Sequence, residues 1–113
     1  FTVALSGGST PKKLYALLAK EPFRSQIEWQ KIHFFFGDER LVLSTDKESN
    51  YRMANEALFS KLQIPAENIH EFQTESGDAE TVALMLEQEI QEVFKLQSNE
   101  FPRFDLILLG MGA

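Results

Sequence analysis

Three short segments carry residues suited to holding a ligand, and each follows an apolar run. The first, SGGST at residues 6–10, offers two glycines and three hydroxyl side chains, a combination that suits an anion. The second, GDER at residues 37–40, offers carboxylates and a guanidinium that can accept a substrate hydroxyl, orient a donor or pair with each other. The third, GMG at residues 110–112, adds a further glycine turn. Together these segments indicate a site for a small anionic molecule.

The residues after the first glycine turn indicate the start of a helix. Thr10 is a good N-cap, and Pro11 is expected at the first helical position, where its missing N–H costs nothing. Lys12 and Lys13 then lie in the first turn, where cations oppose the helix dipole by roughly 0.3–1 kcal/mol each unless an anion is bound. Phosphate binding and two solvated lysines both remain open. The spacing matches neither GxxxxGK[ST] nor GxGxxG.

The charged residues Asp38, Glu39 and Arg40 follow the apolar run 32–36, which is typical of a strand buried on both faces. In open α/β sheets, ligands bind outside the carboxyl ends of the strands. A functional role is therefore favoured over an ordinary charged loop. Arg52 is expected in the first turn of the next helix, where it is either solvated or reaches toward a bound anion.

Apolar runs and helical spacings alternate along the chain and position these segments. Strands are expected over 1–5, 32–36, 69–72 and 104–109, and helices from Pro11, over 51–61 and over about 79–96. This order predicts an α/β fold, a Rossmann-like parallel sheet with helices on both faces, in a single domain over residues 1–113. Leu14, Leu17 and Leu18 are expected to form the buried stripe of the first helix. His33 is expected to be a hydrogen-bonded core residue, and His70 to be exposed and without a role.

The composition limits the classes of protein that fit. The net charge of −6 argues against sequence-independent nucleic-acid binding, and the absence of cysteine excludes disulfides and cysteine-based zinc sites. The sequence contains no apolar run of membrane-spanning length, so no membrane partner and a cytoplasmic location are expected. The chain begins inside a strand and ends at a glycine turn, so it is expected to be an internal segment, incomplete at both ends. The oligomeric state stays open.

Four segments carry a resemblance to a known family. LSGGSTPK, FFGDER, SNYRMANEALF and FDLILLGMG, in this order, resemble the 6-phosphogluconolactonases, which share a superfamily with the glucosamine-6-phosphate isomerases. The resemblance implies hydrolysis of 6-phosphoglucono-δ-lactone in the pentose phosphate pathway, with a sugar phosphate as partner and no metal or organic cofactor. It also implies a set of substrate-binding residues: Gly7, Gly8, Ser9, Thr10, Asp38, Glu39, Arg40 and Arg52.

The same resemblance places the catalytic base outside this chain. In the family the base is expected to be a histidine directly after the GMG turn, beyond Ala113, and neither His33 nor His70 occupies that position. The chain alone is therefore expected to be inactive.

Three alternatives remain. A glucosamine-6-phosphate isomerase or deaminase would have the same phosphate turn, but its second strand would end nearer DEY, from which Arg40 departs. A non-catalytic phosphosugar-binding module would keep the turn and lose the chemistry. The chain could also be only a folding unit that binds nothing tightly.

Overall fold

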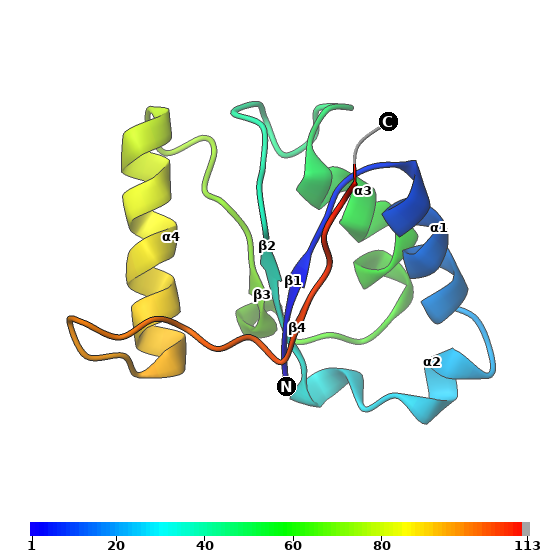
Figure 1. Cartoon of the computed structure of the whole chain (residues 1–113). Helices are drawn as coiled ribbons and strands as arrows, with labels where there is room; N and C mark the ends of the chain where they lie inside the picture. Colours follow the sequence, from blue (N-terminus) through cyan, green and yellow to red (C-terminus); the bar gives the residue numbers. More distant parts are fainter. Residues whose placement is uncertain (112–113) are drawn as a thin grey trace.

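The computed structural model describes residues 1–111 and is built on a parallel four-stranded sheet (Figure 1). Its strands, in the order β3-β2-β1-β4, are β1 (Thr2–Leu5), β2 (His33–Phe36), β3 (Ile69–His70) and β4 (Leu106–Ile107). The predicted parallel α/β sheet is thus confirmed. Because the strands run in one direction, their carboxyl ends meet at one edge, the upper edge in Figure 1.

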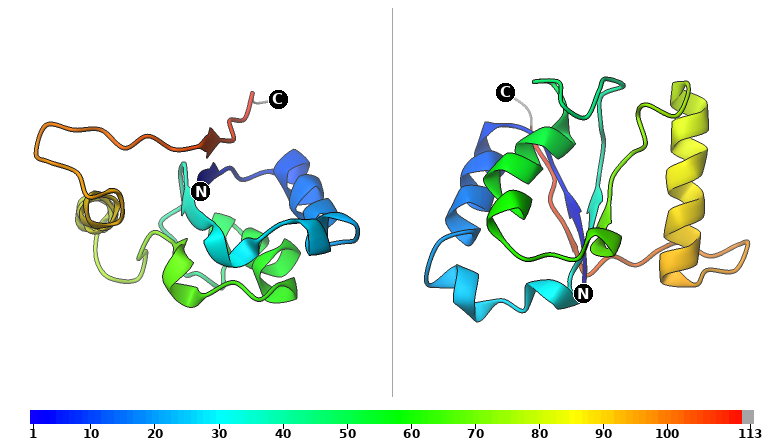
Figure 2. Two further views of the ribbon diagram at one scale, coloured as in Figure 1. Left: turned by 90° about the horizontal axis from the view of Figure 1, so that it is seen from below. Right: turned by 180° about the vertical axis from the view of Figure 1, so that it is seen from behind.

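Helices cover both faces of this sheet, as predicted (Figure 2). On one face lie α1 (Ser9–Leu18), α2 (Phe23–Gln26) and α3 (Asn50–Ala57), and on the other stands α4 (Ala79–Phe94). Short 3-10 turns cover Trp29–Lys31, Phe59–Lys61 and Ala66–Asn68. In the described part of the chain, no helix is long and apolar enough to cross a membrane.

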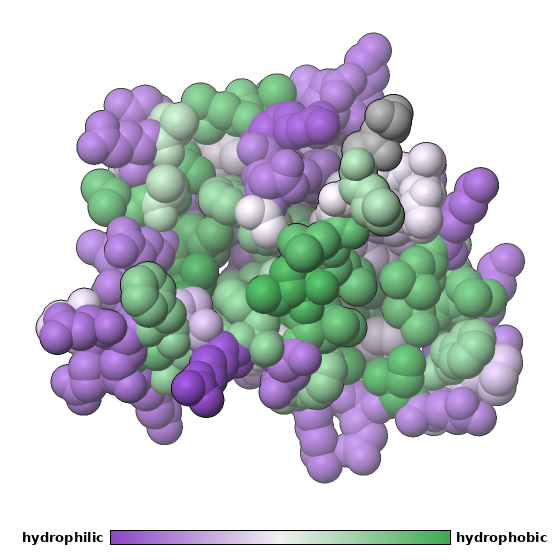
Figure 3. Space-filling model, in the orientation of Figure 1, coloured by the Kyte–Doolittle hydropathy of each residue, from purple (hydrophilic) through white to green (hydrophobic). Residues whose placement is uncertain are grey.

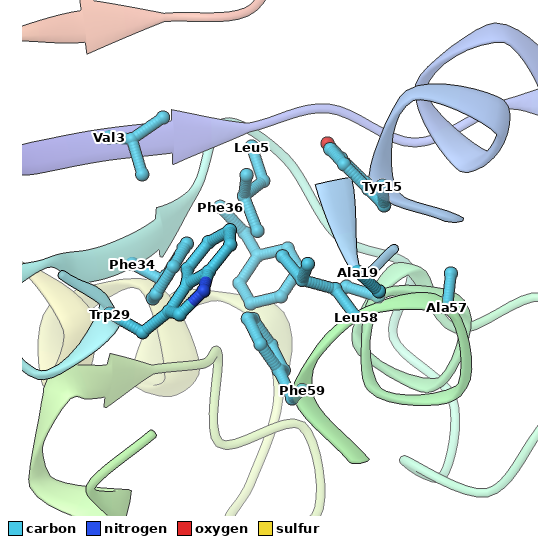
Figure 4. Close-up of a cluster of buried hydrophobic side chains, with 11 residues drawn as sticks. Val3, Leu5, Tyr15, Ala19, Trp29, Phe34, Phe36, Ala57, Leu58 and Phe59 are labelled. Carbon is cyan, nitrogen blue, oxygen red and sulfur yellow. The ribbon is translucent and has the colours of Figure 1, made fainter. Parts of the chain in front are cut away.

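The main core lies between the sheet and the helices α1 and α3 (Figure 4). Side chains alternate between the two faces of a strand, so Val3, Leu5, Phe34 and Phe36 all point to this side. Trp29, Leu58 and Phe59 complete the cluster. The opposite face is smaller and is built from rings of Phe35, Phe94 and Phe104, whose centroids lie 5.0–5.5 Å apart.

The first helix differs from the prediction in its start and its buried face. It begins at Ser9 with Gly8 at the N-cap, so Thr10 is not the cap, and the N–H of Lys12 donates the first helical hydrogen bond to Gly8 O. Leu14 and Leu17 are exposed, whereas Tyr15 and Ala19 are buried. The reason lies in the Tyr15 hydroxyl, which bonds to the turn after β1 and so directs this face of the helix toward the sheet.

The fourth strand is shorter and more exposed than the run 104–109 predicted. Only Leu106 and Ile107 pair with β1, and both side chains are exposed. The surface over β4 is apolar (Figure 3). Its entry is fixed by reciprocal bonds: Thr2 N donates to Asp105 Oδ2 (2.7 Å), and Asp105 N donates to Thr2 Oγ1 (3.0 Å). Of the predicted GMG turn, Gly112 lies outside the described residues.

His70 is buried, with 4% of its surface exposed, so the prediction of an exposed residue is wrong. It lies on the α4 face of the sheet, stacked on Phe35 with ring centroids 4.4 Å apart. The short strand gave no alternation from which this burial could be read, because β3 is only two residues long.

Candidate functional site

The turns after β1 and β2 lie side by side because the two strands are neighbours in the sheet. Leu5 pairs with Phe36, and the N–H of Gly37 donates to Leu5 O at 2.9 Å, so both strands end at the same level. The segments SGGST and GDER therefore enter one edge of the sheet together.

The turn after β1 is held from inside the fold. The Tyr15 hydroxyl donates to Ser6 O (2.7 Å) and accepts from Ser6 N (3.0 Å), so both backbone groups of Ser6 are satisfied by one side chain. Tyr15 is only 1% exposed, and this burial raises the pKa of its phenol above the ordinary value. The neutral hydroxyl thus fixes the backbone of Ser6, the residue that precedes Gly7 and Gly8.

The N-terminus of α1 is open to an anion. Gly8 takes φ 108° at the N-cap, a conformation that favours glycine, and it carries no capping side chain. The first turn holds no acidic residue, and the N–H groups of Ser9 and Thr10 have no acceptor within residues 1–111. At the start of α4, by contrast, the Asp78 carboxylate accepts from Thr81 N. The α1 terminus combines free N–H donors with the positive end of the helix dipole.

Glu39 occupies the other helix N-terminus at this edge. Its carboxylate accepts from Asn50 N (2.7 Å) and Tyr51 N (2.9 Å) in the first turn of α3, and from its neighbour Arg40 N (2.9 Å). Ser49 caps the same helix by accepting from Arg52 N at 3.1 Å. Glu39 therefore fixes the loop after β2 against the start of α3. Of the two helix N-termini at this edge, only that of α1 has no carboxylate from residues 1–111 bound to its N–H groups.

Asn50 joins the two turns. Its side-chain amide donates to Asp38 O (3.2 Å) and Asp38 Oδ1 (3.3 Å). Its other side is against Gly7, where an added Cβ would lie 2.7 Å from Asn50 Cγ and 2.9 Å from Nδ2. Gly7 is thus required by close approach, and Asn50, itself buried, sets the spacing between the glycine turn and Asp38.

Basic side chains gather in front of the α1 terminus. A hollow of about 230 Å³ there is lined by Gly8, Ser9, Lys12, Arg40, Lys47, Glu48, Ser49, Asn50 and Met53. A second hollow of about 250 Å³, lined by Lys12, Lys47, Arg52, Met53 and Glu56, shares both lysines with the first.

The two arginines of these hollows are already engaged. Arg40 pairs with Glu48 at 3.2 Å, and Arg52 pairs with Glu56 at 2.6 Å while also donating to Thr45 O. Lys12 and Lys47 have no carboxylate within 4.0 Å in the described part of the chain. Both lysines are exposed, and their positive charges are available to an anion in either hollow.

The predicted site residues thus fall into groups. Gly8, Ser9 and Arg40 line the first hollow, and Arg52 lines the second. Thr10 faces a different hollow, beside Leu108 and Gly110 at the end of β4. Gly7, Asp38 and Glu39 line neither basic hollow and form the frame behind them.

Several lining residues were not among the predicted site residues, and Lys47 and Asn50 are the most important of them. Lys47 lies in a polar loop whose course depends on turns at Asp46 and Ser49, so its sequence position carried no signal. Asn50 precedes the expected helix 51–61, and its position in the sequence does not show that its amide reaches Asp38 and Gly7.

This arrangement can bind an anion, and no histidine of the described part of the chain lines either basic hollow. His33 begins β2, at the opposite edge of the sheet, and His70 lies on the α4 face. Among residues 1–111, no group of three or more His, Cys, Asp or Glu side chains could hold a metal ion.

Comparison with known proteins gives a consistent set of relatives. The family described as glucosamine-6-phosphate isomerases/6-phosphogluconolactonase matches residues 1–113. A 6-phosphogluconolactonase from Synechocystis sp. is 47% identical over 111 residues, which cover 98% of this chain and 45% of that protein.

Solved structures agree with this result. The crystal structure of a protein named devB has a TM-score of 0.90 at 45% identity, covering 98% of this chain and 46% of its own. The 6-phosphogluconolactonase from Thermotoga maritima has a TM-score of 0.83 at 38% identity, covering 99% and 46%. The chain spans about half the length of the relatives it matches.

Proposed function

Since the chain belongs to the glucosamine-6-phosphate isomerase/6-phosphogluconolactonase family, we propose that the protein carrying it hydrolyses 6-phosphoglucono-δ-lactone to 6-phosphogluconate. A cytoplasmic role in the pentose phosphate pathway is part of this proposal. The relative from Synechocystis sp. and the Thermotoga maritima structure are both named 6-phosphogluconolactonase, which favours the lactonase over the isomerase within the family.

The observation that carries the proposal is the open start of α1 facing unpaired lysines. A phosphate ester at this point would accept from Ser9 and Thr10 N–H groups and the Ser9 hydroxyl, with Lys12 and Lys47 supplying positive charge. This local charge offsets the net charge of −6 on the chain. Bound phosphate would also remove the cost of placing Lys12 at the positive end of the helix dipole.

Arg40 and Arg52 have a secondary part in this proposal. Each holds a glutamate at the rim, and a dianionic phosphate would compete with these exposed pairs, which are individually worth about 0–1 kcal/mol. The guanidinium groups can therefore turn to the ligand at little cost.

The chemical step needs groups that this arrangement does not supply. Hydrolysis requires water to attack the lactone carbonyl, a base to take the proton and donors for the oxyanion. We infer that residues 1–113 contribute the phosphate contacts, and that the base, the histidine expected after Gly112, comes from elsewhere in the protein. The isolated chain is then inactive.

The test is titration calorimetry on the protein carrying this chain, with 6-phosphogluconate against unphosphorylated gluconate. We expect selective binding of the phosphorylated sugar, and a loss of roughly tenfold to a hundredfold in affinity for Lys12→Met, since a hydrogen bond to a charged group is worth about 1.5–3 kcal/mol. Lys13→Met is the matched control, because Lys13 lines neither basic hollow. Equal binding of the two sugars, or equal losses in the two variants, would contradict the assignment.

Enzyme assays separate the chemistry from the binding. Hydrolysis of 6-phosphoglucono-δ-lactone above its spontaneous rate supports a lactonase, whereas turnover of glucosamine 6-phosphate identifies the isomerase alternative. Selective binding without turnover of either compound identifies a phosphosugar-binding module.

A further inference from the structure

A chain of polar contacts on the α4 face takes no part in the proposed site. The His33 and His70 rings approach through Nδ1 and Nε2 at 2.9 Å, and His70 Nδ1 lies 2.6 Å from Glu89 Oε1. The three residues come from β2, β3 and α4, so the contacts join the helix to two strands.

His70 is the buried member of the pair, whereas His33 and Glu89 are partly exposed. His70 is 4% exposed, lies parallel to Phe35 and stacks with His33 at 5.2 Å between ring centroids. The other charged groups that act on His33 are Glu67 and the amino group of Phe1. On the α4 side, the carboxylate of Glu71 lies near that of Glu89.

The hydrogen bonds limit how many protons the pair can hold. The Glu89 carboxylate only accepts, so His70 Nδ1 carries a hydrogen. His70 Nε2 can then accept from His33 Nδ1–H. When the pair takes up one proton, either imidazole can become the charged ring. In both cases only one hydrogen lies between His33 Nδ1 and His70 Nε2, so both hydrogen bonds are kept. A second added proton places a hydrogen on both nitrogens of that contact, and the two imidazolium groups repel each other.

We propose that His33, His70 and Glu89 form a latch that holds α4 on the sheet, admits one proton, and opens when acidification forces a second proton onto the histidine pair. The other described contacts that hold α4 are apolar, chiefly Phe94 against Phe35 and Phe104, and they do not respond to pH. Opening would expose the face of the sheet that carries Phe35.

The direction of the effect follows from proton linkage. Burial and the charge of His70 lower the pKa of His33 below its ordinary value of 6.5. Once α4 opens, His33 is hydrated and returns to its ordinary pKa of about 6.5, and the two separated rings no longer prevent uptake of a second proton. The open state then binds one proton more than the closed state, so opening is favoured by about tenfold for each pH unit below that value.

The experiment is hydrogen exchange of the α4 backbone amides in the full-length protein, expressed as protection factors between about pH 7.5 and about pH 5. We expect protection to fall by tenfold or more in the wild type. In His33→Gln it should stay constant or rise, because the amide can donate to His70 or accept from it but cannot take a proton. Glu87→Gln, on the exposed side of α4, should behave as the wild type.

Nitrogen-15 spectra of the wild-type imidazoles give a test that needs no variant. We expect one proton to be taken up by the pair while α4 remains protected. Two imidazolium rings with undiminished protection would overturn the latch. An equal fall of protection in His33→Gln and the wild type, or its loss in Glu87→Gln, would do the same.

Discussion

The close approach of Gly7 to Asn50 leads to a quantitative prediction for Gly7→Ala. The added methyl would lie under 3 Å from three side-chain atoms of Asn50, and that amide is buried and tied to Asp38 by two hydrogen bonds. Displacing it loses about 1 kcal/mol per bond, with about 1–3 kcal/mol for the overpacked contact. Alanine also lowers the conformational entropy of the unfolded chain, which raises the free energy of unfolding by about 0.4–1 kcal/mol. We expect a net loss of about 2–4 kcal/mol, measured by urea unfolding.

A double-mutant cycle tests the cause of that loss. If Asn50 is the obstacle, Gly7→Ala should cost less than about 1 kcal/mol in an Asn50→Ala background, giving a coupling energy of about 2 kcal/mol or more. Gly37→Ala is the matched control in the neighbouring turn, since its Cβ would lie 3.5 Å from Leu5 O, an ordinary contact. The reasoning is refuted if Gly7→Ala costs the same with and without Asn50.

Three further changes test other parts of the frame. Tyr15→Phe leaves both backbone groups of Ser6 without their partner and should cost about 2 kcal/mol in unfolding free energy, with weaker binding of 6-phosphogluconate. Glu39→Gln removes the charge at the start of α3 and should lower stability by about 1–2 kcal/mol at neutral pH, with helix content followed by circular dichroism. Glu71→Gln should stabilise the protein at neutral pH. Burial, with Glu39, Glu75 and Glu89 nearby, raises the Glu71 pKa, so its ionisation weakens the folded state as pH rises above its ordinary value; a pH series of unfolding curves that shows no such gain would exclude this account.

The sheet and the location of the candidate site could be predicted because their signals are local. The runs 1–5 and 32–36 are apolar except for Thr2 and His33, and a glycine follows each within two residues, so the two strands can be predicted from composition. Because ligands bind at the carboxyl ends of strands, SGGST and GDER are expected to share one site if these two strands are neighbours.

The details that escaped prediction depend on contacts between distant segments. Tyr15 is buried in place of Leu14 because its hydroxyl finds Ser6, a partner that helical periodicity does not contain. Glu39 looked like a substrate contact, yet its carboxylate accepts from N–H groups eleven and twelve residues later. The burial of His70 arises from α4, whose Glu89 lies nineteen residues along the chain.

The hydrogen bonds between Thr2 and Asp105 have a consequence for folding kinetics. They close a loop of 103 residues, and the central strand β1 has one neighbour, β4, at the far end of the chain. Contacts of high sequence separation slow folding, because loop entropy must be lost before they form. At ribosomal rates of about 5–20 residues per second, that edge of β1 waits roughly 5–20 s for its partner. During synthesis β1 can pair only with β2, so the nascent chain passes through a stage with an open central edge, where a chaperone or a misfolding contact can act.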